Sequence, residues 1–418
     1  MLRLNQGQEF IVNKAIEWFK ESKEQLFQYD GPPGAGISVV LMEIINRLGL
    51  NINVDVAPMA FIGSASLVMR LKGLFTAKTI HSWIYHIRTV KGDYNEKYGR
   101  YETKRVFIKK TFLPVSLIVV DEAYCVPEEL ARDIMSFGIK VIACGDQNQL
   151  PPVASRPGFL INGTIYHLTE VMRQSGLDDI IYIANMVMRG YTLLNGFYGN
   201  SMVIDFEDLT NDMLLWADII ICGRNDTRDF FNAKVRELKG YNSILPSYGE
   251  KLVCRNNNWN ETIDDNGNEV CLVNGLIGTV LNCPEISTYD KKKGTIDVWF
   301  KPDLTMGNDF FITKANYKYL SSNAAERHNI KEMMNSKRSK YNKTHGSLLE
   351  FAYAITCHVA QGGQFHKVLY IEEFMNPMEQ NSLNLVGATR ADTQLIYVKK
   401  PDYNHSMIFK NVIKDHIF

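Results

Sequence analysis

The stretch Leu-Pro-Val-Ser-Leu-Ile-Val-Val-Asp-Glu occupies residues 113–122. Its continuous apolar run is typical of a strand that is buried on both faces of a sheet. A second strand of this kind begins at Lys140 and ends at Gly145-Asp146. Upstream, residues 9–26 and 38–48 carry apolar side chains at helical spacing. Strands that alternate with helices predict a parallel α/β sheet, whose ligands bind at the carboxyl ends of the strands.

The second half of the chain repeats this α/β pattern around a segment of different character. Residues 217–222 predict a strand and residues 226–239 a helix, and the runs 368–371 and 393–398 predict further strands. Between them, residues 250–320 hold short strands separated by polar turns, which is typical of a small β-barrel. The sequence therefore predicts two α/β units, the second of which contains a β-barrel insert.

A glycine-rich loop lies between a predicted strand end and a helix, and it reads Gly31-Pro32-Pro33-Gly34-Ala35-Gly36-Ile37-Ser38. It matches the phosphate-loop pattern G-x-x-x-x-G-K-[ST] except at Ile37. The glycines let backbone N–H groups surround phosphate oxygens, and the helix N-terminus adds a partial positive charge. Ser38 is placed to bind Mg²⁺. Taken alone, a glycine-rich turn without its lysine is more simply a strand-to-helix connection.

The acidic pair Asp121-Glu122 follows a buried strand directly. Carboxylates at such a position are costly unless they have partners or a chemical role. In nucleotide-driven motors the first carboxylate of such a pair holds Mg²⁺ and the second polarises the attacking water. The alternative is a pair that caps a helix beginning near Pro127. The glycine loop upstream favours the nucleotide interpretation.

The composition indicates a globular protein of several domains, because 418 residues are too many for one core. Lys and Arg together number 46, as do Asp and Glu, so the total charge neither favours nucleic acid nor excludes a local basic groove. The seven cysteines include no C-x-x-C pair, so we expect free thiols in a reducing compartment. No apolar run approaches the roughly 18 residues that span a bilayer, and the N-terminus has no apolar signal core, so we expect a cytoplasmic protein without a membrane anchor.

A longer and more specific string, Gly-Asp-Gln-Asn-Gln-Leu-Pro-Pro-Val, occupies residues 145–153. With the glycine loop and the acidic pair, it makes the chain resemble superfamily 1 helicases of type B, in the RecD-like and Dda-like group of phages and bacteria. So many motifs in one order leave little room for chance. The further motifs follow in the order that the family has: Gln8, Ala57-Pro58, Thr79–Ser82, Leu168–Gln174, Asn274-Gly275, Gly278, Tyr353–His358, Gln361-Gly362 and Gly387–Ala391.

The resemblance implies two RecA-like parallel-sheet domains, with a β-hairpin insertion in the first and a small SH3-like β-barrel insertion in the second. The ATP-binding domain 1A would comprise residues 1–83 and 113–175, and the hairpin or pin domain 1B would comprise residues 84–112. Domain 2A would comprise residues 176–249 and 346–418, on either side of the insert 2B at residues 250–345.

The resemblance also assigns residues to ATP and Mg²⁺. Gln8 would read the adenine edge, and Gln149 would sense the γ-phosphate. Arg173 and Arg390 would act as arginine fingers, because a guanidinium presents a planar fork of donors to phosphate oxygens. Mg²⁺ would be held by Ser38 and Asp121. Without the flanking motifs, Gln8 would be taken for a surface helix residue and the two arginines for surface salt bridges.

Further residues are implied as contacts to single-stranded DNA and to the fork. The single-strand track would be lined by Thr79, His81, Thr356, His358 and Gln361, although a lone histidine is more often structural. Residues 84–112 interleave basic side chains, among them Lys104 and Arg105, with aromatic ones, which suits phosphate contact and base stacking. In the family a hairpin here splits the duplex; the alternative is a solvated charged hairpin with no such purpose.

Three positions depart from the family's pattern. Ile37 stands where the phosphate loop has lysine, and Ser64 and Val359 stand where the family has basic residues near DNA or phosphate. Losing a transition-state contact of the lysine type costs roughly 10²–10³-fold in rate, so hydrolysis is expected to be impaired. Ile37→Lys is then expected to raise ATPase activity by at least ~10²-fold. A nearby lysine, for example Lys78, is an alternative source of the missing charge.

Two functions remain open at this point. The first is an ATP-dependent DNA helicase or translocase that moves 5'-to-3' on single-stranded DNA, expected to be a monomer that meets replication or recombination proteins. The second is a catalytically inactive protein of helicase fold that binds nucleic acid or regulates a partner. The surviving residues Asp121, Glu122, Gln149, Arg173 and Arg390 favour the first, and Ile37 favours the second.

Overall fold

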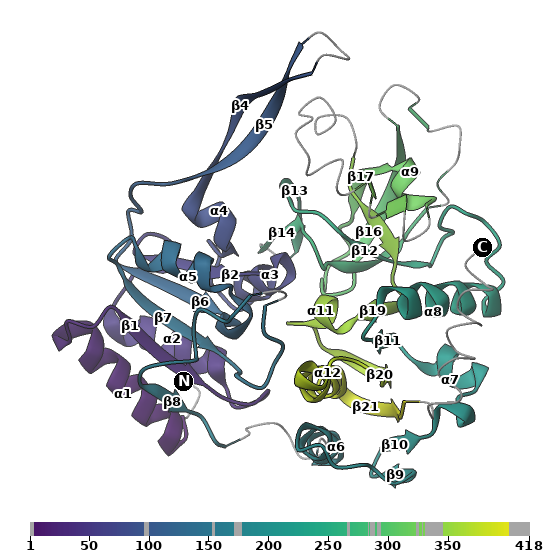
Figure 1. The fold of residues 1–418 in the computed structure, drawn as a ribbon, viewed down its shortest axis with the longest axis horizontal. Helices are drawn as coiled ribbons and strands as arrows, with labels where there is room; N and C mark the ends of the chain where they lie inside the picture. The colour runs from purple at the N-terminus through teal and green to yellow at the C-terminus, as the bar shows by residue number, and fades with distance from the viewer. Residues whose placement is uncertain are drawn as a thin grey trace.

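The computed structural model consists of two α/β lobes that face each other, with a long hairpin on the first lobe and a β-rich insert on the second (Figure 1). The structure describes residues 4–400 apart from 96–99, 153–154, 171–177, 266–267, 283, 285–288, 291–293, 323–325, 328 and 331–345.

The first lobe is built on a six-stranded sheet in the order β3-β2-β6-β7-β1-β8, and each strand is parallel to its neighbours. Consecutive residues of β6 pack into different cores: Val119 joins the cluster of α1 and α2, whereas Val120 joins that of α4 and α5. Helices therefore cover both faces, as the continuous apolar strands predict. The strands are β1 (Leu26–Asp30), β2 (Val56–Ala60), β3 (Lys78–Thr79), β6 (Leu117–Asp121), β7 (Lys140–Gly145) and β8 (Ile165–His167).

The first helix has a well-defined start, because Asn5 and Gln8 form a capping box at its N-terminus. Its buried side chains, which include Ile11, Ala15 and Trp18, recur at helical spacing and face the sheet. The helices of this lobe are α1 (Gln6–Glu21), α2 (Ile37–Leu48), α3 (Gly63–Leu71), α4 (Ile80–Ile84) and α5 (Glu128–Met135), with a short 3₁₀ turn η2 (Ala123–Cys125).

Strands β4 (Tyr85–Asn95) and β5 (Arg100–Lys109) form an antiparallel hairpin that projects away from the first sheet (Figure 1). The hairpin is anchored at its base, where Lys109 forms an ion pair with Asp133 of α5 at 3.3 Å. The predicted hairpin insertion is thus present between the third and sixth strands of the chain.

The second lobe contains a six-stranded sheet in the order β19-β11-β20-β21-β10-β9. All neighbours are parallel except the edge strand β9, which is antiparallel to β10. The strands are β9 (Gly196–Tyr198), β10 (Ser201–Ile204), β11 (Ile219–Cys222), β19 (Ala354–Thr356), β20 (Phe365–Ile371) and β21 (Ala391–Val398). The helices are α6 (Asp178–Met188), α7 (Asn211–Trp216), α8 (Asn225–Leu238), α11 (Cys357–Ala360) and α12 (Pro377–Ala388), with the 3₁₀ turn η3 (Phe206–Asp208).

The insert is a five-stranded antiparallel sheet in the order β17-β16-β15-β12-β18 around its own apolar core. A bridge between Ala315 and Ser347 links the edge strand β17 to the residues before β18, so the sheet curls toward closure. The strands are β12 (Lys251–Cys254), β15 (Ile277–Val280), β16 (Thr295–Pro302), β17 (Phe311–Asn316) and β18 (Leu349–Phe351). A hairpin of β13 (Asn258–Asp265) and β14 (Asn268–Leu272) and the short helix α9 (Tyr317–Leu320) complete the insert.

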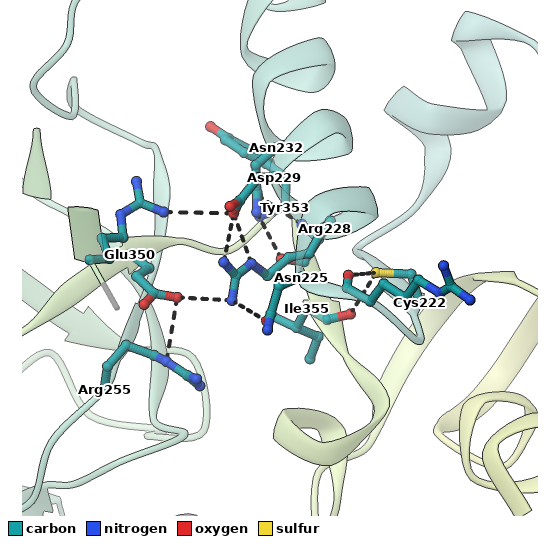
Figure 2. Close-up of polar contacts among 12 residues, drawn as sticks. Cys222, Asn225, Arg228, Asp229, Asn232, Arg255, Glu350, Tyr353 and Ile355 are labelled. Carbon is teal, nitrogen blue, oxygen red and sulfur yellow. Dashed lines mark hydrogen bonds and ion pairs between the residues drawn. The ribbon is translucent and has the colours of Figure 1, made fainter. Parts of the chain in front are cut away.

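A buried polar network joins the insert to the second lobe (Figure 2). Arg228 of α8 forms an ion pair with Glu350 of β18 at 3.3 Å and another with the adjacent Asp229 at 2.7 Å. Arg255 lies 3.4 Å from the same Glu350 carboxylate. Arg228 and Glu350 are both almost fully buried, so their charges depend on the ion pairs of this network for compensation.

The sequence misplaces one strand of the first sheet. The run Val54–Ala57 predicts a strand that ends at Pro58, whereas β2 begins at Val56 and continues through Pro58 to Ala60. A proline is tolerated here because β3 pairs only with Met59 and Ala60, and the Pro58 carbonyl accepts instead from the Trp83 indole at 2.7 Å.

Two findings concern all the residues that the structure describes. The six cysteines that it describes are all buried and free. In the same residues, no helix has the length and apolar character needed to cross a bilayer. Where one domain ends and the next begins remains a prediction.

Candidate nucleotide-binding site

The glycine loop connects β1 to α2 at the carboxyl edge of the first sheet. Gly31 N–H donates to the Gly145 carbonyl at 3.1 Å, which ties the start of the loop to the end of β7. Gly34 and Gly36 have φ values of 88° and 86°, in the left-handed region that glycine tolerates best. The loop then enters α2 at Ile37, so the first N–H groups of a 12-residue helix point toward the loop.

Gln8 of α1 contacts this loop through its side-chain amide. Its Nε2 donates to the Ala35 carbonyl at 3.0 Å, and its Oε1 accepts from the Asn5 N–H at 3.1 Å. A Cβ at Gly36 would lie 2.4 Å from Gln8 Nε2, so a larger residue would displace this amide and would also have to adopt a left-handed backbone. Gln8 is buried and is not among the cavity-lining residues, so contact with adenine remains a prediction that this structure does not display.

A cavity of about 1070 Å³ opens in front of the loop and is lined by both lobes and the insert. From the predicted loop, its wall includes Gly31, Pro33, Gly34, Gly36, Ile37 and Ser38, whereas Pro32 and Ala35 do not line it. The first lobe adds Asp121, Glu122 and Gln149, and the second lobe adds Val359, Gln361 and Arg390. Residues far apart in the sequence thus converge on one space that suits a ligand of nucleotide size.

The acidic pair lies at the end of β6, and both residues line this cavity. Burial raises the pKa of Glu122 to about 7, with a further contribution from the charge of Asp121. Burial also raises the pKa of Asp121, while the charge of Lys72 and the Glu122 N–H, which donates to Asp121 Oδ1 at 2.9 Å, oppose this shift. A carboxylate with a pKa near 7 can exchange a proton with water at neutral pH.

The backbone of Glu122 has φ 51° and ψ 42°, a left-handed conformation that is uncommon outside glycine. Local strain of this kind persists where the surroundings fix it, and it concentrates at functional sites. The next residues form the 3₁₀ turn η2, and the Gly145 Cα approaches so closely that an added Cβ would lie 3.0 Å from the Ala123 nitrogen. Glu122 therefore lies at the sharp turn between the end of β6 and the start of η2.

Gln149 and Arg390 approach the acidic pair from opposite lobes. Gln149 follows Asp146, whose carbonyl accepts from the Gln149 N–H at 3.2 Å and whose carboxylate accepts from the Asn148 N–H at 2.9 Å. Arg390 is buried and donates to the carbonyls of Val386 and Gly363 at 3.1 and 3.2 Å. Its charge lowers the pKa of Glu122 against the effect of burial, so the guanidinium lies within electrostatic reach of the site.

Ile37 is integrated into the first lobe. Its side chain packs against the core formed by α1, α2 and the sheet, and its carbonyl accepts from the buried Tyr29 hydroxyl at 3.0 Å. The position that carries a cation in the phosphate-loop pattern is therefore apolar in structure as well as in sequence. No charge on the loop itself faces the cavity.

Mg²⁺ fits the oxygen donors at the end of the loop. Ser38 contributes a hydroxyl and Asp121 a carboxylate, which are ligands that hard cations prefer. In the part of the chain that the structure describes, no group of three or more His, Cys, Asp and Glu side chains is arranged to hold a metal. A magnesium ion bound here would therefore depend on phosphate oxygens and water for its remaining ligands.

The predicted DNA-contact residues lie at equivalent places in the two lobes. Thr79 ends the edge strand β3 and precedes the short helix α4, and Thr356 ends the edge strand β19 and precedes the short helix α11. Each threonine is followed two residues later by a histidine, His81 or His358. Both threonines are nearly buried, and desolvation lowers the pKa of both histidines, so neutral rings are favoured.

Some predicted residues lie elsewhere or outside the described residues. Gln361, which the sequence assigns to the DNA track, lines the nucleotide cavity, and its contact with DNA stays a prediction. Arg173 lies outside the described residues. Lys104 and Arg105 pair in register with Val90 and Thr89 on the hairpin.

Sequence reasoning missed a cation that lines this cavity. Lys72 directly follows α3, and its Nζ donates to Ser38 Oγ at 3.1 Å. Lys78, the lysine considered from the sequence, is not among the cavity-lining residues. Its charge acts elsewhere: it adds to the lowering of the Lys110 pKa by burial, and it opposes the raising of the Cys271 pKa by burial. The helical spacing from Ser64 through Val68 to Lys72 could have revealed that these three share one face.

Two curated relatives resemble parts of the chain. It is 32% identical over 167 residues to the ATP-dependent DNA helicase PIF1 of Saccharomyces cerevisiae, a match that covers 37% of this chain and 18% of that protein. It is 22% identical over 291 residues to an uncharacterized protein of Acanthamoeba polyphaga mimivirus, covering 58% of each. The chain thus spans less than two thirds of the length of either relative.

Solved structures of Pif1 helicases share the fold along nearly the whole chain. The Candida albicans Pif1 helicase aligns over 99% of this chain and 100% of its own, with a TM-score of 0.54 and 16% identity. Bacteroides Pif1 bound to single-stranded DNA aligns over 100% and 98%, with a TM-score of 0.54 and 18% identity. Bacteroides Pif1 in complex with ADP-AlF3 and single-stranded DNA aligns over 99% and 98%, with a TM-score of 0.53 and 16% identity.

The family model described as an AAA domain matches residues 3–195, which include the glycine loop, the acidic pair and the Gly145–Val153 string. Residues 3–195 are therefore similar to an AAA domain, and the chain has the two-lobed fold of the solved Pif1 helicase structures.

Proposed function

We propose that this protein is an ATP-dependent DNA helicase or translocase of superfamily 1B that moves 5'-to-3' on single-stranded DNA. The observation that carries the proposal is the convergence of the glycine loop, Glu122 and Arg390 on one cavity between two lobes. A site that both lobes complete couples nucleotide chemistry to lobe movement, which a motor requires. The Bacteroides Pif1 structure with ADP-AlF3 and single-stranded DNA supports the same pairing of ligands.

In this proposal the residues of the chain divide the work on ATP. The loop N–H groups and the N-terminus of α2 bind the phosphates. Glu122 accepts a proton from the attacking water, and Gln149 and Arg390 contact the terminal phosphate and its developing charge. Arg173 serves as a second arginine finger, and Gln8 contacts the base. Mg²⁺, held by Ser38 and Asp121 when bound, neutralises phosphate charge.

The proposed DNA track crosses both lobes. The matching Thr-x-His segments at residues 79–81 and 356–358 support it, since each ends an edge strand of its sheet. The hairpin, with Lys104 and Arg105 on β5, would stand at the junction of a fork. The Bacteroides structures with single-stranded DNA support this class of ligand.

The biological setting belongs to the proposal as well. The motif order supports a RecD-like or Dda-like protein of phage or bacterial origin that works as a monomer in the cytoplasm. Its partners would then be proteins of replication, recombination or repair.

Ile37 favours a second candidate, a helicase-fold protein that binds nucleic acid or regulates a partner without hydrolysis. Because the loop itself presents no cation, hydrolysis that depends on the loop alone should be slow. Restoring the lysine with Ile37→Lys should then raise ATPase activity by at least ~10²-fold, provided that no other cation already supplies the charge.

Steady-state ATPase assays with and without single-stranded DNA separate the two candidates. The helicase proposal expects DNA-stimulated turnover that Glu122→Gln abolishes, in the native chain or at least in Ile37→Lys. Absence of turnover in both proteins, together with intact DNA binding, would overturn it in favour of the non-catalytic candidate.

A further inference from the structure

The missing charge of the phosphate loop has a counterpart on a neighbouring helix. Lys72 caps the C-terminus of α3, and its ammonium donates to Ser38 Oγ at 3.1 Å. Ser38 is the residue that follows Ile37, so the ammonium lies beside the part of the loop where a phosphate-loop lysine acts. In the sequence, α2, β2 and α3 separate Lys72 from the loop, and only the fold brings them together.

Helix α3 presents this lysine through its regular spacing. Ser64, Val68 and Lys72 are four residues apart and all line the cavity, so they form one face of the helix. Gly73 has a φ of 102°, which ends the helix directly after Lys72 and turns the chain away. A cation at a helix C-terminus is also favoured by the helix dipole.

The position of α3 is fixed at both ends. Near its start, the Ser64 N–H donates to the Asn274 carbonyl of the insert at 3.0 Å. Near its end, Arg70 forms an ion pair with Glu269 of β14 at 3.0 Å. The helix is therefore held between the insert and the first sheet, which places Lys72 without support from Ile37.

Lys72 differs from the other cations that line the cavity. Arg47 is engaged by Glu9 at 2.5 Å and by Glu43 at 2.7 Å. Arg390 donates to backbone carbonyls of its own lobe. Among the residues that the structure describes, Lys72 forms no ion pair, and its neighbour is the neutral hydroxyl of Ser38. Its charge nevertheless acts on the site, since it lowers the pKa of Asp121 against the effect of burial.

We propose that Lys72 supplies from α3 the phosphate-binding charge that Ile37 cannot supply from the loop. Its ammonium would exchange Ser38 Oγ for oxygens of the terminal phosphates of bound ATP, an ionic contact that requires no covalent step. This inference rests on the proposed ATP-binding function of the cavity. It explains why the acidic pair and Arg390 persist beside a loop that lacks its lysine.

Calorimetric measurement of MgATPγS binding to the full chain tests this proposal without reference to turnover. Lys72→Met should weaken MgATPγS binding by roughly 10- to 100-fold, as expected for one charge-assisted contact. Lys78→Met, which removes a nearby exposed lysine that does not line the cavity, should leave the affinity unchanged. Ile37→Lys introduced into Lys72→Met should restore binding, and Lys72→Arg should retain part of it.

The outcomes separate this inference from the proposed function. Native MgATPγS affinity in Lys72→Met would overturn the role of Lys72 alone. Absence of MgATPγS binding by the native chain would overturn the ATP-binding function and, with it, the role of Lys72. Because Lys72 is exposed, its substitution should leave the thermal unfolding curve unchanged, which excludes misfolding as the cause of weaker binding.

Discussion

Glu122 combines a left-handed backbone with a pKa of about 7, against an ordinary value of 4.5. The shift arises mainly from burial, with a contribution from Asp121, so the ionised form is destabilised in the folded protein. The folded protein therefore binds a proton that the unfolded chain releases at lower pH. Stability that depends on this proton is present below about pH 4.5 and is lost as the pH rises through about 7.

Glu122→Gln removes this ionisation while keeping the shape of the side chain. We expect the variant to unfold at nearly the native temperature at pH 4 and at a higher temperature than the native chain at pH 8. Thermal unfolding across this pH range measures the difference. Equal melting temperatures at pH 8 would contradict the raised pKa.

If turnover is present in the native chain, it should increase with pH through about 7, since the base must be ionised.

At this scale the sequence identified residues that the fold brings to one cavity, but it did not identify every residue that lines it. Residues of the loop, the acidic pair, Gln149 and Arg390 line one cavity, and their roles there stay predictions. Short-range rules describe the loop and the acidic pair because both lie directly at a strand end. Lys72 and the position of Gln361 depend on how a helix and a turn pack across the cavity, which no local pattern encodes. Gln8 shows a further limit, since its amide is used within the protein.

At the scale of elements, periodicity predicted both sheets and the β-rich insert, because apolar runs and polar turns determine which segments form strands. The hairpin was implied by the family resemblance instead. Strand limits were less accurate. Pro58 lies within β2. A local pattern cannot predict this, because the identity of the neighbouring strand decides whether the missing N–H of proline costs a hydrogen bond. The ion pairs of Figure 2 were not predicted either, because their charges come from α8, the start of the insert and β18.

The network of Figure 2 should contribute strongly to stability. Glu350→Ala leaves the buried charge of Arg228 without one of its two carboxylate partners, which should lower the free energy of unfolding by roughly 3–5 kcal/mol. Glu17→Gln, in an exposed pair with Lys14 on α1, should cost less than about 1 kcal/mol. Urea denaturation measures both. A loss below about 1 kcal/mol for Glu350→Ala would mean that the network is not required for stability.

The hairpin should act on forks rather than on single strands. Lys104→Ala combined with Arg105→Ala removes two charges from β5, so we expect fork binding and unwinding to fall more than single-strand binding. Lys109 is kept, since it anchors the hairpin to Asp133. Replacing the exposed Lys20 and Lys23 near the end of α1 removes equal charge and serves as the control. Fluorescence anisotropy on both substrates measures the effect, and equal losses on both would argue against a separating role.

At the scale of the whole molecule, the two lobes share both proposed ligands. The cavity takes its loop from the first lobe and Arg390 from the second, and the Thr-x-His segments stand at the edge strand of each sheet. A ligand that bridges the lobes at one place favours their closed arrangement at the other. Nucleotide and DNA should therefore strengthen each other's binding by the same factor, because coupling between two sites is reciprocal.

Arg390→Lys tests this coupling. The shorter, single-point cation should lose the forked contact across the cavity, so the factor by which single-stranded DNA tightens MgATPγS binding should fall toward one from a native value of roughly 5–150. Nucleotide binding without DNA should weaken less than binding with DNA, because the loop and Lys72, which hold the phosphates, belong to the first lobe. Arg189→Lys, at an exposed site after α6, is the matched control. Calorimetry for the nucleotide and anisotropy for DNA give the coupling factor independently. A native coupling factor in Arg390→Lys would show that the lobes communicate through another contact, and α3, which carries Lys72 and is bound to the insert, is the next candidate.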